Sequence, residues 1–249
     1  PLVEARASGG GMSLTANKGM LLTATWGLGS AIAQGEIVPD RYDLDRNGTL
    51  CDTVVGHKDH SVHCVHHQVG PSAQAVAAPR VQEPCLNEKQ IKELSDLLVR
   101  AEDLLGKPVE IEWAQDEAGF KMLQARPLKM EPAQVPDKIW LRHPGIKGHP
   151  SGIGWGSGRA CVINCECELS RLAPGDILVT KVAGPALSQV LPRVSGVVAE
   201  LGGSTSHLAS LARERGIPMV LGVPEATRKI PDGAQVGVDG VMGMVRWIN

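Results

Sequence analysis

The sequence GGSTSHLASLARERGIPMVLG, residues 202–222, decides how the second half of this chain is interpreted. It contains a glycine turn, hydroxyl residues that can cap a helix, and a histidine, His207, in the first helical turn. The first amide groups of a helix have no partner within it, and the helix dipole adds positive charge there. A phosphate carried by His207 would therefore be stabilised. We expect the helix to end at Gly216, because Pro218 cannot continue it. On these residues alone, a capping segment with an incidental histidine is the alternative.

The whole stretch resembles the phosphohistidine segment of the phosphoenolpyruvate-utilising enzymes. That group includes phosphoenolpyruvate synthase, pyruvate phosphate dikinase and enzyme I of the sugar phosphotransferase system. The resemblance implies that His207 is transiently phosphorylated and that Thr205 and Ser206 orient the ring or its phosphate. It also makes Arg213, on the same helix, a candidate counter-charge. The matching residues are Gly202, Gly203, Thr205, Ser206, His207, Ala212, Arg213, Gly216, Ile217, Pro218 and Gly222.

The amino-acid composition is that of a globular protein and gives no sign of a nucleic-acid partner. Of the 249 residues, 43% are hydrophobic and 21% are charged, and the formal net charge of −2 provides no basic field. No apolar run reaches the roughly 18 residues that span a bilayer, and the first residues do not resemble a signal peptide. We therefore expect a soluble cytoplasmic protein that has neither nucleic acid nor membrane as a partner.

Six cysteines are spread along the chain without the spacing of a disulfide framework, which favours a reduced, cytosolic setting. Three of them, Cys161, Cys165 and Cys167, fall close together, with Glu166 and Glu168 beside them. A metal site would need a fourth ligand that the sequence does not indicate. We therefore interpret these three residues as solvent-facing or half-buried thiols at the end of a strand.

The chain is expected to divide into two α/β domains. The segment KMEPAQVPDKIWLRHPGIK, residues 129–147, holds three prolines and little periodic apolar pattern, which is typical of a linker. We place the first domain at residues 1–132, the linker at 133–147 and the second domain at 148–249.

Short apolar runs bounded by Gly, Pro or Asp follow the linker, and each has the length of a strand. With the helix at 207–215 and a second one near 186–193, they predict a compact α/β domain. Its order of elements resembles the swivelling phosphohistidine domain of the dikinases. The runs are ACVI, DILVTKV, SGVVAEL, IPMVLGV, AQVGVDG and GMVRWI.

The first domain contains an expected helix and an expected hairpin in succession. Residues 88–105 place apolar side chains at helical spacing, and Gly106 and Pro108 end the helix. The sequence VEIEWAQDEAGFKMLQARPL, residues 109–128, then predicts two strands around a turn at 116–119. This hairpin carries the polar residues on which the interpretation of the first domain depends.

Three residues of the hairpin fall on one face of the expected sheet. Glu112 lies opposite Gln124, and Arg126 shares the face of Gln124 because strand side chains alternate. Carboxylate and amide oxygens suit Mg²⁺, which usually shares its coordination shell with phosphates. The guanidinium group suits phosphate oxygens. These residues predict a magnesium–nucleotide site, and an ordinary amphipathic hairpin with a salt bridge is the alternative.

A second resemblance covers this first domain. The WGLG, QG and PD pattern within residues 26–40, followed by EIEWA and LQARPL in the hairpin, resembles the ATP-grasp nucleotide-binding domain of the phosphoenolpyruvate synthases. The resemblance implies ATP and Mg²⁺ as cofactors. It implies Glu112 and Gln124 as magnesium ligands and Arg126 as a phosphate contact. The expected fold is therefore a partial ATP-grasp domain followed by a compact α/β swivelling domain.

Two positions in the first domain depart from the family pattern. Ser30 stands directly after WGLG, where the family usually has Glu, and Thr23 stands where an acidic residue usually precedes the Trp. The phosphate pocket is therefore expected to carry less negative charge than is usual in the family.

A histidine-rich segment in the first domain suggests a zinc site, since imidazole and thiolate ligands can share a tetrahedral ion. A spacing of three would line only part of a helix face and would alternate faces on a strand, which favours a solvated strand and loop. The family resemblance also implies a strand lysine here, a role that Lys58 fits. The segment contains His57, His60, His63, His66 and His67, with Cys64.

Together, the resemblances imply a dikinase-type phosphotransferase. ATP would phosphorylate His207 in two stages, with AMP and inorganic phosphate released, and the mobile domain would pass the phosphoryl group to an acceptor. That acceptor is pyruvate if the chain is part of a phosphoenolpyruvate synthase and phenol if it is a phenylphosphate synthase subunit. A non-catalytic phosphohistidine carrier with a decayed ATP site is a third alternative. The earlier half of the ATP-grasp domain and an acceptor domain or subunit are expected as missing partners.

Overall fold

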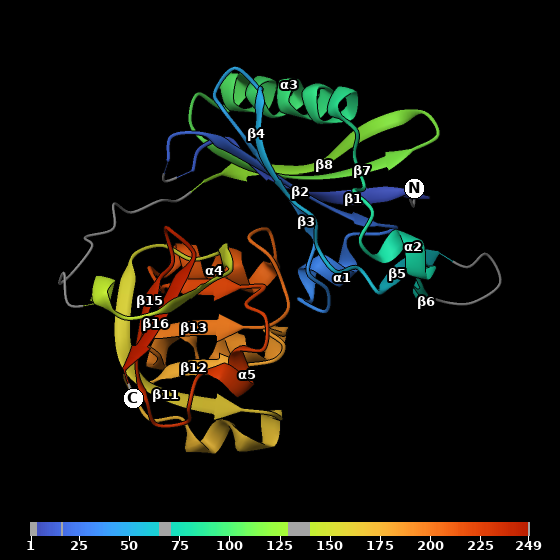
Figure 1. Cartoon of the computed structure of the whole chain (residues 1–249). Coiled ribbons are helices and arrows are strands. Elements are labelled where there is room, and N and C mark those ends of the chain that lie inside the picture. The colour runs from blue at the N-terminus through green and yellow to red at the C-terminus, as the bar shows by residue number, and fades with distance from the viewer. Residues whose placement is uncertain (1–3, 16, 65–70, 129–139, 249) are drawn as a thin grey trace. The chain divides into compact units, whose positions relative to one another are not determined.

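The computed structural model describes residues 4–15, 17–64, 71–128 and 140–248. The chain forms two compact units, one of residues 1–32 and 37–128, the other of residues 33–36 and 129–249. Figure 1 shows a sheet and its covering helices in each unit.

The first unit is built on a six-stranded sheet in which each neighbouring pair of strands is antiparallel. The strand order is β4-β3-β2-β1-β7-β8, so the two hairpin strands β7 and β8 lie at one edge. The strands are β1 (Ala7–Met12), β2 (Met20–Trp26), β3 (Asp40–Leu44), β4 (Leu50–Val54), β7 (Val109–Asp116) and β8 (Gly119–Pro127).

Helix α3 (Glu88–Leu105) lies across one face of this sheet, as Figure 1 shows. It begins with a capping box in which Asn87 and Gln90 exchange hydrogen bonds, and it ends at Gly106, which takes the left-handed conformation. Alternate strand residues face the helix and form one core with it. That core includes Leu22, Tyr42, Ile91, Leu94, Leu98, Ala101, Val109, Ile111 and Trp113.

The first unit also contains a smaller group of elements and a buried ion pair. It contains the hairpin of β5 (His60–Cys64) and β6 (Pro71–Ala75) and the short helices α1 (Ser30–Ala33) and α2 (Ala78–Val81). Lys58 and Asp40 are both fully buried and bonded to each other. The Asp40 carboxylate also accepts hydrogen bonds from the Cys85 amide and the Tyr42 hydroxyl. Burial, and secondly the Asp40 charge, raise the pKa of Tyr42 above its ordinary value.

The second unit is built on an eight-stranded mixed sheet of order β10-β14-β13-β12-β11-β15-β16-β9. Strands β11 to β14 run parallel, whereas β10, β15, β16 and β9 join antiparallel. The strands are β9 (Gly145–Lys147), β10 (His149–Pro150), β11 (Trp155–Ile163), β12 (Ile177–Thr180), β13 (Gly196–Ala199), β14 (Met219–Leu221), β15 (Gln235–Asp239) and β16 (Met244–Ile248).

Each face of this sheet has its own apolar cluster. One cluster joins Leu178 and Val197 to Leu208 and Ala212 of helix α4, and the other joins Val179 and other strand residues to the short helix α5. The helical segments are η1 (Trp140–Arg142), η2 (Glu166–Arg171), η3 (Pro185–Gln189), η4 (Leu191–Arg193), α4 (His207–Glu214) and α5 (Ala226–Lys229).

Several expected elements are confirmed by the structure, and two details differ. The helix at 88–105, the hairpin after it, the helix from His207 and six apolar strands in the second half are present. The helix expected near 186–193 is present as two short 3₁₀ segments, η3 and η4. Strand β9 lies inside the segment expected as a linker. It was not predicted, because a strand of three residues is too short to show an apolar periodicity.

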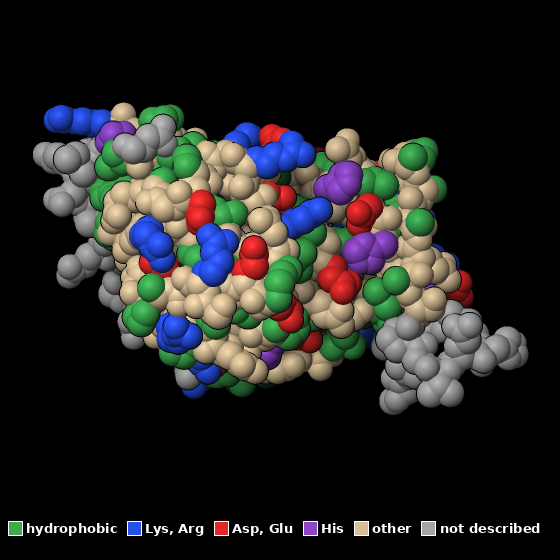
Figure 2. Space-filling view, turned by 90° about the horizontal axis from the view of Figure 1, so that it is seen from below, with side chains coloured by type: hydrophobic (Ala, Val, Ile, Leu, Met, Phe, Trp, Pro, Cys, Tyr) green, Lys and Arg blue, Asp and Glu red, His purple; other side chains and the backbone are tan. Residues whose placement is uncertain are grey.

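The surface carries both signs of charge. On the face shown in Figure 2, Lys and Arg side chains are interspersed with Asp and Glu side chains, in keeping with the formal net charge of −2. Among the helices of the described ranges, none is both long enough and apolar enough to cross a membrane.

Candidate active-site residues in the two units

In the second unit, His207 is the first residue of helix α4 and its side chain is exposed. Ser206 caps the helix: its Oγ accepts a hydrogen bond from the Ala209 amide at 3.2 Å. A hydroxyl at this position satisfies one of the amides that a helix start leaves without a partner. An exposed imidazole beside the remaining amides is therefore well placed to carry an anionic group.

The loop before His207 is fixed by a glycine and by buried hydrogen bonds. Gly202 has φ of +100°, a conformation that side chains rarely adopt, and a Cβ there would lie 3.2 Å from Leu221. The fully buried Ser204 donates its hydroxyl hydrogen to the Pro150 carbonyl at 2.7 Å. The loop thus presents His207 from a rigid frame.

Arg213 lies inside this frame and not at the surface. It is 5% exposed, and its Nη1 donates to the carbonyl of Ser204 at 2.6 Å and to that of Ser151 at 3.1 Å. These bonds tie the histidine loop to the segment after β10. Thr205, predicted with Ser206 to orient the imidazole, is half-buried in the same loop.

In the first unit, the register of the β7–β8 hairpin brings the predicted polar residues together. Glu112 pairs directly with Gln124, and the ladder is irregular just after Glu112. Both side chains are exposed on the sheet face opposite α3. Gly10 of β1 is the other neighbour of Glu112, and it pairs in turn with Thr23. Because Gly10 has no side chain, it leaves the space beside the carboxylate open at this register.

Arg126 has a carboxylate partner that sequence reasoning missed. Its Nη2 lies 3.4 Å from Glu110, whose side chain is largely buried. Glu110 pairs with Arg126 and is two residues from Glu112, so all four polar side chains share one face. The hairpin alternation that placed Arg126 and Gln124 together would also have found Glu110.

The glycine turn of WGLG is held against this sheet. Gly27 has φ of +73°, and a Cβ there would lie 2.5 Å from the Val62 carbonyl. The indole of Trp26 donates to the Arg80 carbonyl at 3.0 Å, and the Arg80 guanidinium stacks 4.0 Å from its ring centroid. Ser8 donates its hydroxyl hydrogen to the Gly27 carbonyl at 2.7 Å. The turn therefore has a fixed conformation before any ligand binds.

Of the two positions that depart from the family pattern, Ser30 follows this turn directly, whereas Thr23 lies earlier in the chain, within β2. Thr23 is fully buried, and its Oγ1 accepts a hydrogen bond from the Gly10 amide at 3.2 Å. Thr25, two residues on, faces the same side of the sheet. Its hydroxyl oxygen and that of Ser30 are buried without a hydrogen-bond partner in the described part of the protein. Buried hydroxyls without partners are uncommon and suit a site that receives a polar group.

These residues fit a magnesium ion that shares its shell with phosphates. Glu112 and Gln124 offer one carboxylate and one amide oxygen, and Mg²⁺ is typically held by one or two protein oxygens with water and phosphate completing its shell. Within the described ranges, no group of three or more His, Cys, Asp or Glu residues is arranged to hold a metal by itself.

The zinc hypothesis for the histidine-rich segment gains no support from the described residues. His60 bonds to Asp59 at 2.7 Å, and His63 bonds to the Ser61 hydroxyl at 2.9 Å. His66 and His67 lie outside the described residues. Lys58, expected as a strand lysine, lies just before β5 and is buried in its ion pair with Asp40.

The cysteine prediction is wrong for two residues and partly wrong for a third. Cys165 and Cys167 form a disulfide with Cα atoms 5.3 Å apart. Cys165 is the extended residue that precedes η2, and the chain turns into the helix at Glu166, which brings the two Cα atoms within the range of a disulfide. Cys161 is buried and not solvent-facing. Spacing alone could not show that the chain leaves β11 in this conformation.

Two family models cover most of the chain. Residues 1–142 match the pyruvate phosphate dikinase AMP/ATP-binding domain, and residues 172–243 match the PEP-utilising enzyme mobile domain. These domains define the class of phosphoenolpyruvate-utilising enzymes.

Similar proteins with assigned names identify the family within this class. The chain is 34% identical over 240 residues to the phosphoenolpyruvate synthase of Pyrococcus furiosus, covering 91% of this chain and 29% of the relative. It is 32% identical over 229 residues to a probable phosphoenolpyruvate synthase of Methanothermobacter thermautotrophicus, covering 91% and 33%. It is 31% identical over 239 residues to the Escherichia coli phosphoenolpyruvate synthase, covering 90% and 30%. The chain belongs to the phosphoenolpyruvate synthase and pyruvate phosphate dikinase family. It spans about a third of the length of these relatives.

Proposed function

We propose that this chain supplies the nucleotide-binding and phosphohistidine parts of an ATP-dependent, dikinase-type phosphotransferase. The observation that carries the proposal is His207, exposed at the start of a capped helix in a rigid loop. The match to a mobile domain that includes this residue supports it. In this proposal the first unit is the C-terminal part of an ATP-grasp domain.

The chemistry at His207 is nucleophilic transfer in stages. A neutral imidazole nitrogen attacks the β-phosphorus of ATP, a nitrogen–phosphorus bond forms, and the bond to the AMP oxygen breaks. Water then removes the γ-phosphoryl group as inorganic phosphate, which leaves one phosphoryl group on the ring. Ser206 and Thr205 orient the ring or its phosphate, and the amides at the helix start stabilise the negative charge.

The polar face of the β7–β8 hairpin binds the nucleotide phosphates. Glu112 and Gln124 hold Mg²⁺, which neutralises charge on the transferring group when bound. Arg126, oriented by Glu110, donates to phosphate oxygens. The partnerless hydroxyls of Thr25 and Ser30 support a polar ligand beside the WGLG turn.

The proposed acceptor is pyruvate, because the relatives that match over nine-tenths of this chain are phosphoenolpyruvate synthases. An enol oxygen of pyruvate attacks the phosphohistidine phosphorus, the nitrogen–phosphorus bond breaks, and His207 is regenerated. The overall balance is ATP, pyruvate and water consumed, with AMP, inorganic phosphate and phosphoenolpyruvate formed.

The test is made on the full-length parent protein with any partner subunits present. Incubation with Mg²⁺ and β-³²P-labelled ATP is expected to place acid-labile label on the peptide that contains His207, and pyruvate is expected to release it. His207→Ala abolishes the label, whereas His57→Ala, which removes another exposed histidine, keeps it. Label that survives His207→Ala would refute the proposal, and release by phenol in place of pyruvate would identify the other acceptor.

The nucleotide site is tested by a matched pair of variants on one hairpin. Glu112→Gln is expected to lower the labelling rate by roughly a hundredfold or more, since metal stabilisation of phosphoryl transfer is worth several kcal/mol. Glu117→Gln removes an exposed carboxylate at the hairpin turn and should leave the rate unchanged. Equal effects of the two substitutions would refute the assigned role of Glu112. No label in the unmodified parent would favour a carrier charged by another enzyme.

A further inference from the structure

The disulfide between Cys165 and Cys167 has no part in the proposed phosphoryl transfer. Both cysteines are exposed. By contrast, Cys85 and Cys161 are buried, and Cys51 is exposed but unbonded to another sulfur. Exposed sulfurs are accessible to attack by a thiolate, whereas burial raises the pKa of the Cys161 thiol and hinders its reaction. Among the described cysteines, the pair at 165 and 167 is therefore best placed for thiol–disulfide exchange.

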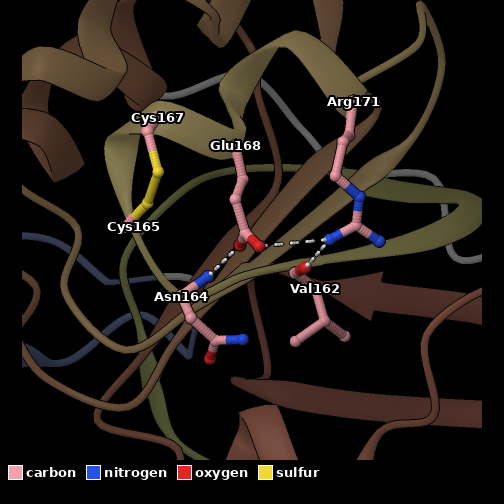
Figure 3. The surroundings of a disulfide bond; sticks show 6 residues. All are labelled: Val162, Asn164, Cys165, Cys167, Glu168 and Arg171. Atoms are coloured by element: carbon pink, nitrogen blue, oxygen red, sulfur yellow. Dashed lines mark hydrogen bonds and ion pairs between the residues drawn. A yellow bond between two sulfur atoms is a disulfide. The ribbon is translucent and has the colours of Figure 1, made fainter.

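The disulfide closes the start of the short helix η2, which is anchored by polar contacts. Figure 3 shows Arg171 of η2 reaching back to Val162 of strand β11 and Glu168 reaching back to Asn164, which follows that strand. Glu168 accepts a hydrogen bond from the Asn164 amide at 2.8 Å, and Arg171 donates to the Val162 carbonyl at 3.1 Å. Arg171 also pairs with Asp232 at 2.6 Å. The disulfide therefore lies at the start of a segment that is hydrogen-bonded directly to strand β11.

The segment with the disulfide and the loop to His207 both leave the sheet at the carboxyl ends of its parallel strands. Ile163 of β11 is in register with Thr180 of β12, which is in register with Ala199 of β13. These strands are parallel, so their carboxyl ends lie together, about 10 Å apart from β11 to β13. The disulfide follows β11 directly, and the loop to His207 follows β13.

The same segment also shares a core with the helix that begins at His207. Leu169 of η2 packs against the apolar cluster that contains Leu172, Leu208 and Ala209. Protein interiors are close-packed, so a shift of one side chain displaces the side chains that contact it. A change in η2 thus has a continuous path of contacts to α4.

We propose that Cys165 and Cys167 are a reversible dithiol–disulfide pair whose state sets the order of η2 and, through the shared core, of helix α4. In the reducing direction, a thiolate of an external dithiol attacks one sulfur, and the Cys165–Cys167 bond breaks as a mixed disulfide forms. The second thiol of the reductant then releases the protein cysteine. Two electrons and two protons reach the protein, and the reductant leaves as a disulfide. Oxidation by a small-molecule disulfide runs the exchange in the opposite direction. The two protein thiols become the Cys165–Cys167 disulfide, and the small molecule leaves as two thiols.

Thiol mapping in the full chain tests the exchange. Protein equilibrated with dithiothreitol, a dithiol, or with oxidised glutathione is desalted, denatured, labelled with N-ethylmaleimide and digested with trypsin, which yields the peptide of residues 160–171. We expect three labels on this peptide after reduction and one, on Cys161, after oxidation, with fragment ions separating Cys161 from the pair. Three labels under both conditions, or glutathione retained on either cysteine, would overturn the proposal. So would stoichiometric binding of zinc by the reduced pair that blocks its oxidation.

Hydrogen exchange tests the coupling to α4. Reduction is expected to cause a loss of protection in residues 166–172 and 207–214. The Cys51→Ser chain should keep this response, and the Cys165→Ser/Cys167→Ser chain should lose it. A response confined to residues 166–172, or one that persists in the double variant, would overturn the coupling. Neither readout needs ATP or an acceptor, so its failure is distinguishable from failure of the proposed function.

Discussion

At the scale of single residues, the two candidate sites are supported in different ways. His207 is exposed, and its position is set by buried neighbours: Ser206 caps its helix, and Ser204 and Arg213 bind backbone carbonyls. In the hairpin, Glu112 and Gln124 are themselves exposed, and their alignment is set by strand register alone. The histidine site should therefore be the more sensitive to substitutions outside the reacting groups.

Arg213 gives the clearest test of that difference. Arg213→Met removes a buried guanidinium and leaves the carbonyls of Ser204 and Ser151 without this donor. We expect the second unit to lose about 2–3 kcal/mol of unfolding free energy, measured by urea unfolding. Arg215→Met, at the C-cap of the same helix, removes one exposed bond to the Ser188 carbonyl and should cost less than about 1 kcal/mol. Equal losses would mean that the guanidinium does not brace the loop.

Sequence reasoning located these residues but not their contacts. The pairing of Glu112 with Gln124 was predicted, but the turn alone would pair Glu112 with Leu123. The irregularity between Glu112 and Trp113 shifts the register by one residue and brings Gln124 opposite. The bonds of Arg213 could not be predicted, because both partners are backbone carbonyls and one of them, that of Ser151, lies 62 residues away in the chain. A helix pattern shows which face is apolar and says nothing of which carbonyls meet that face.

At the scale of elements, a buried carboxylate joins two neighbouring strands of the second unit. Asp176, just before β12, is 4% exposed and accepts hydrogen bonds from Arg159 of β11 at 2.7 and 3.2 Å and from the Ala173 amide at 2.9 Å. Burial opposes ionisation, but the hydrogen bonds from Arg159 and Ala173 outweigh it and lower the pKa of Asp176. The bond therefore stabilises the start of β12 only while Asp176 is ionised.

The pH dependence of stability follows from the sign of this shift. Because the pKa is lower in the folded state, the stabilisation is present above the unfolded value of about 3.9 and is lost as pH falls through the folded value. We expect Asp176→Asn to lower the unfolding free energy by about 2 kcal/mol at pH 7, with the difference shrinking below about pH 4. Asp103→Asn, at an exposed position of α3, should change it by less than about 0.5 kcal/mol. An Asp176→Asn effect that is independent of pH would contradict this assignment.

At the scale of the whole molecule, the sequence predicted the elements better than the way they join. Helix α3 and the apolar strands were found because their periodicity is local. The disulfide and β9 were missed because each depends on where the chain turns next, and a three-residue strand has no pattern of its own. Glu110 was missed for another reason: its partner Arg126 was assigned to phosphate alone.

The apolar cores of the two units are separate, and this predicts which strands a cavity will destabilise. Leu98 of α3 is fully buried in the core of the first unit, and Leu178 of β12 is fully buried in one core of the second. Leu98→Ala should cost about 2–5 kcal/mol and reduce hydrogen-exchange protection in β1, β2 and β7. Protection in β11 to β14 should stay unchanged, and Leu178→Ala should give the reverse pattern. Loss of protection throughout the chain from either substitution would mean that the two units unfold as one, since a cavity destabilises the whole of the cooperative unit that contains it.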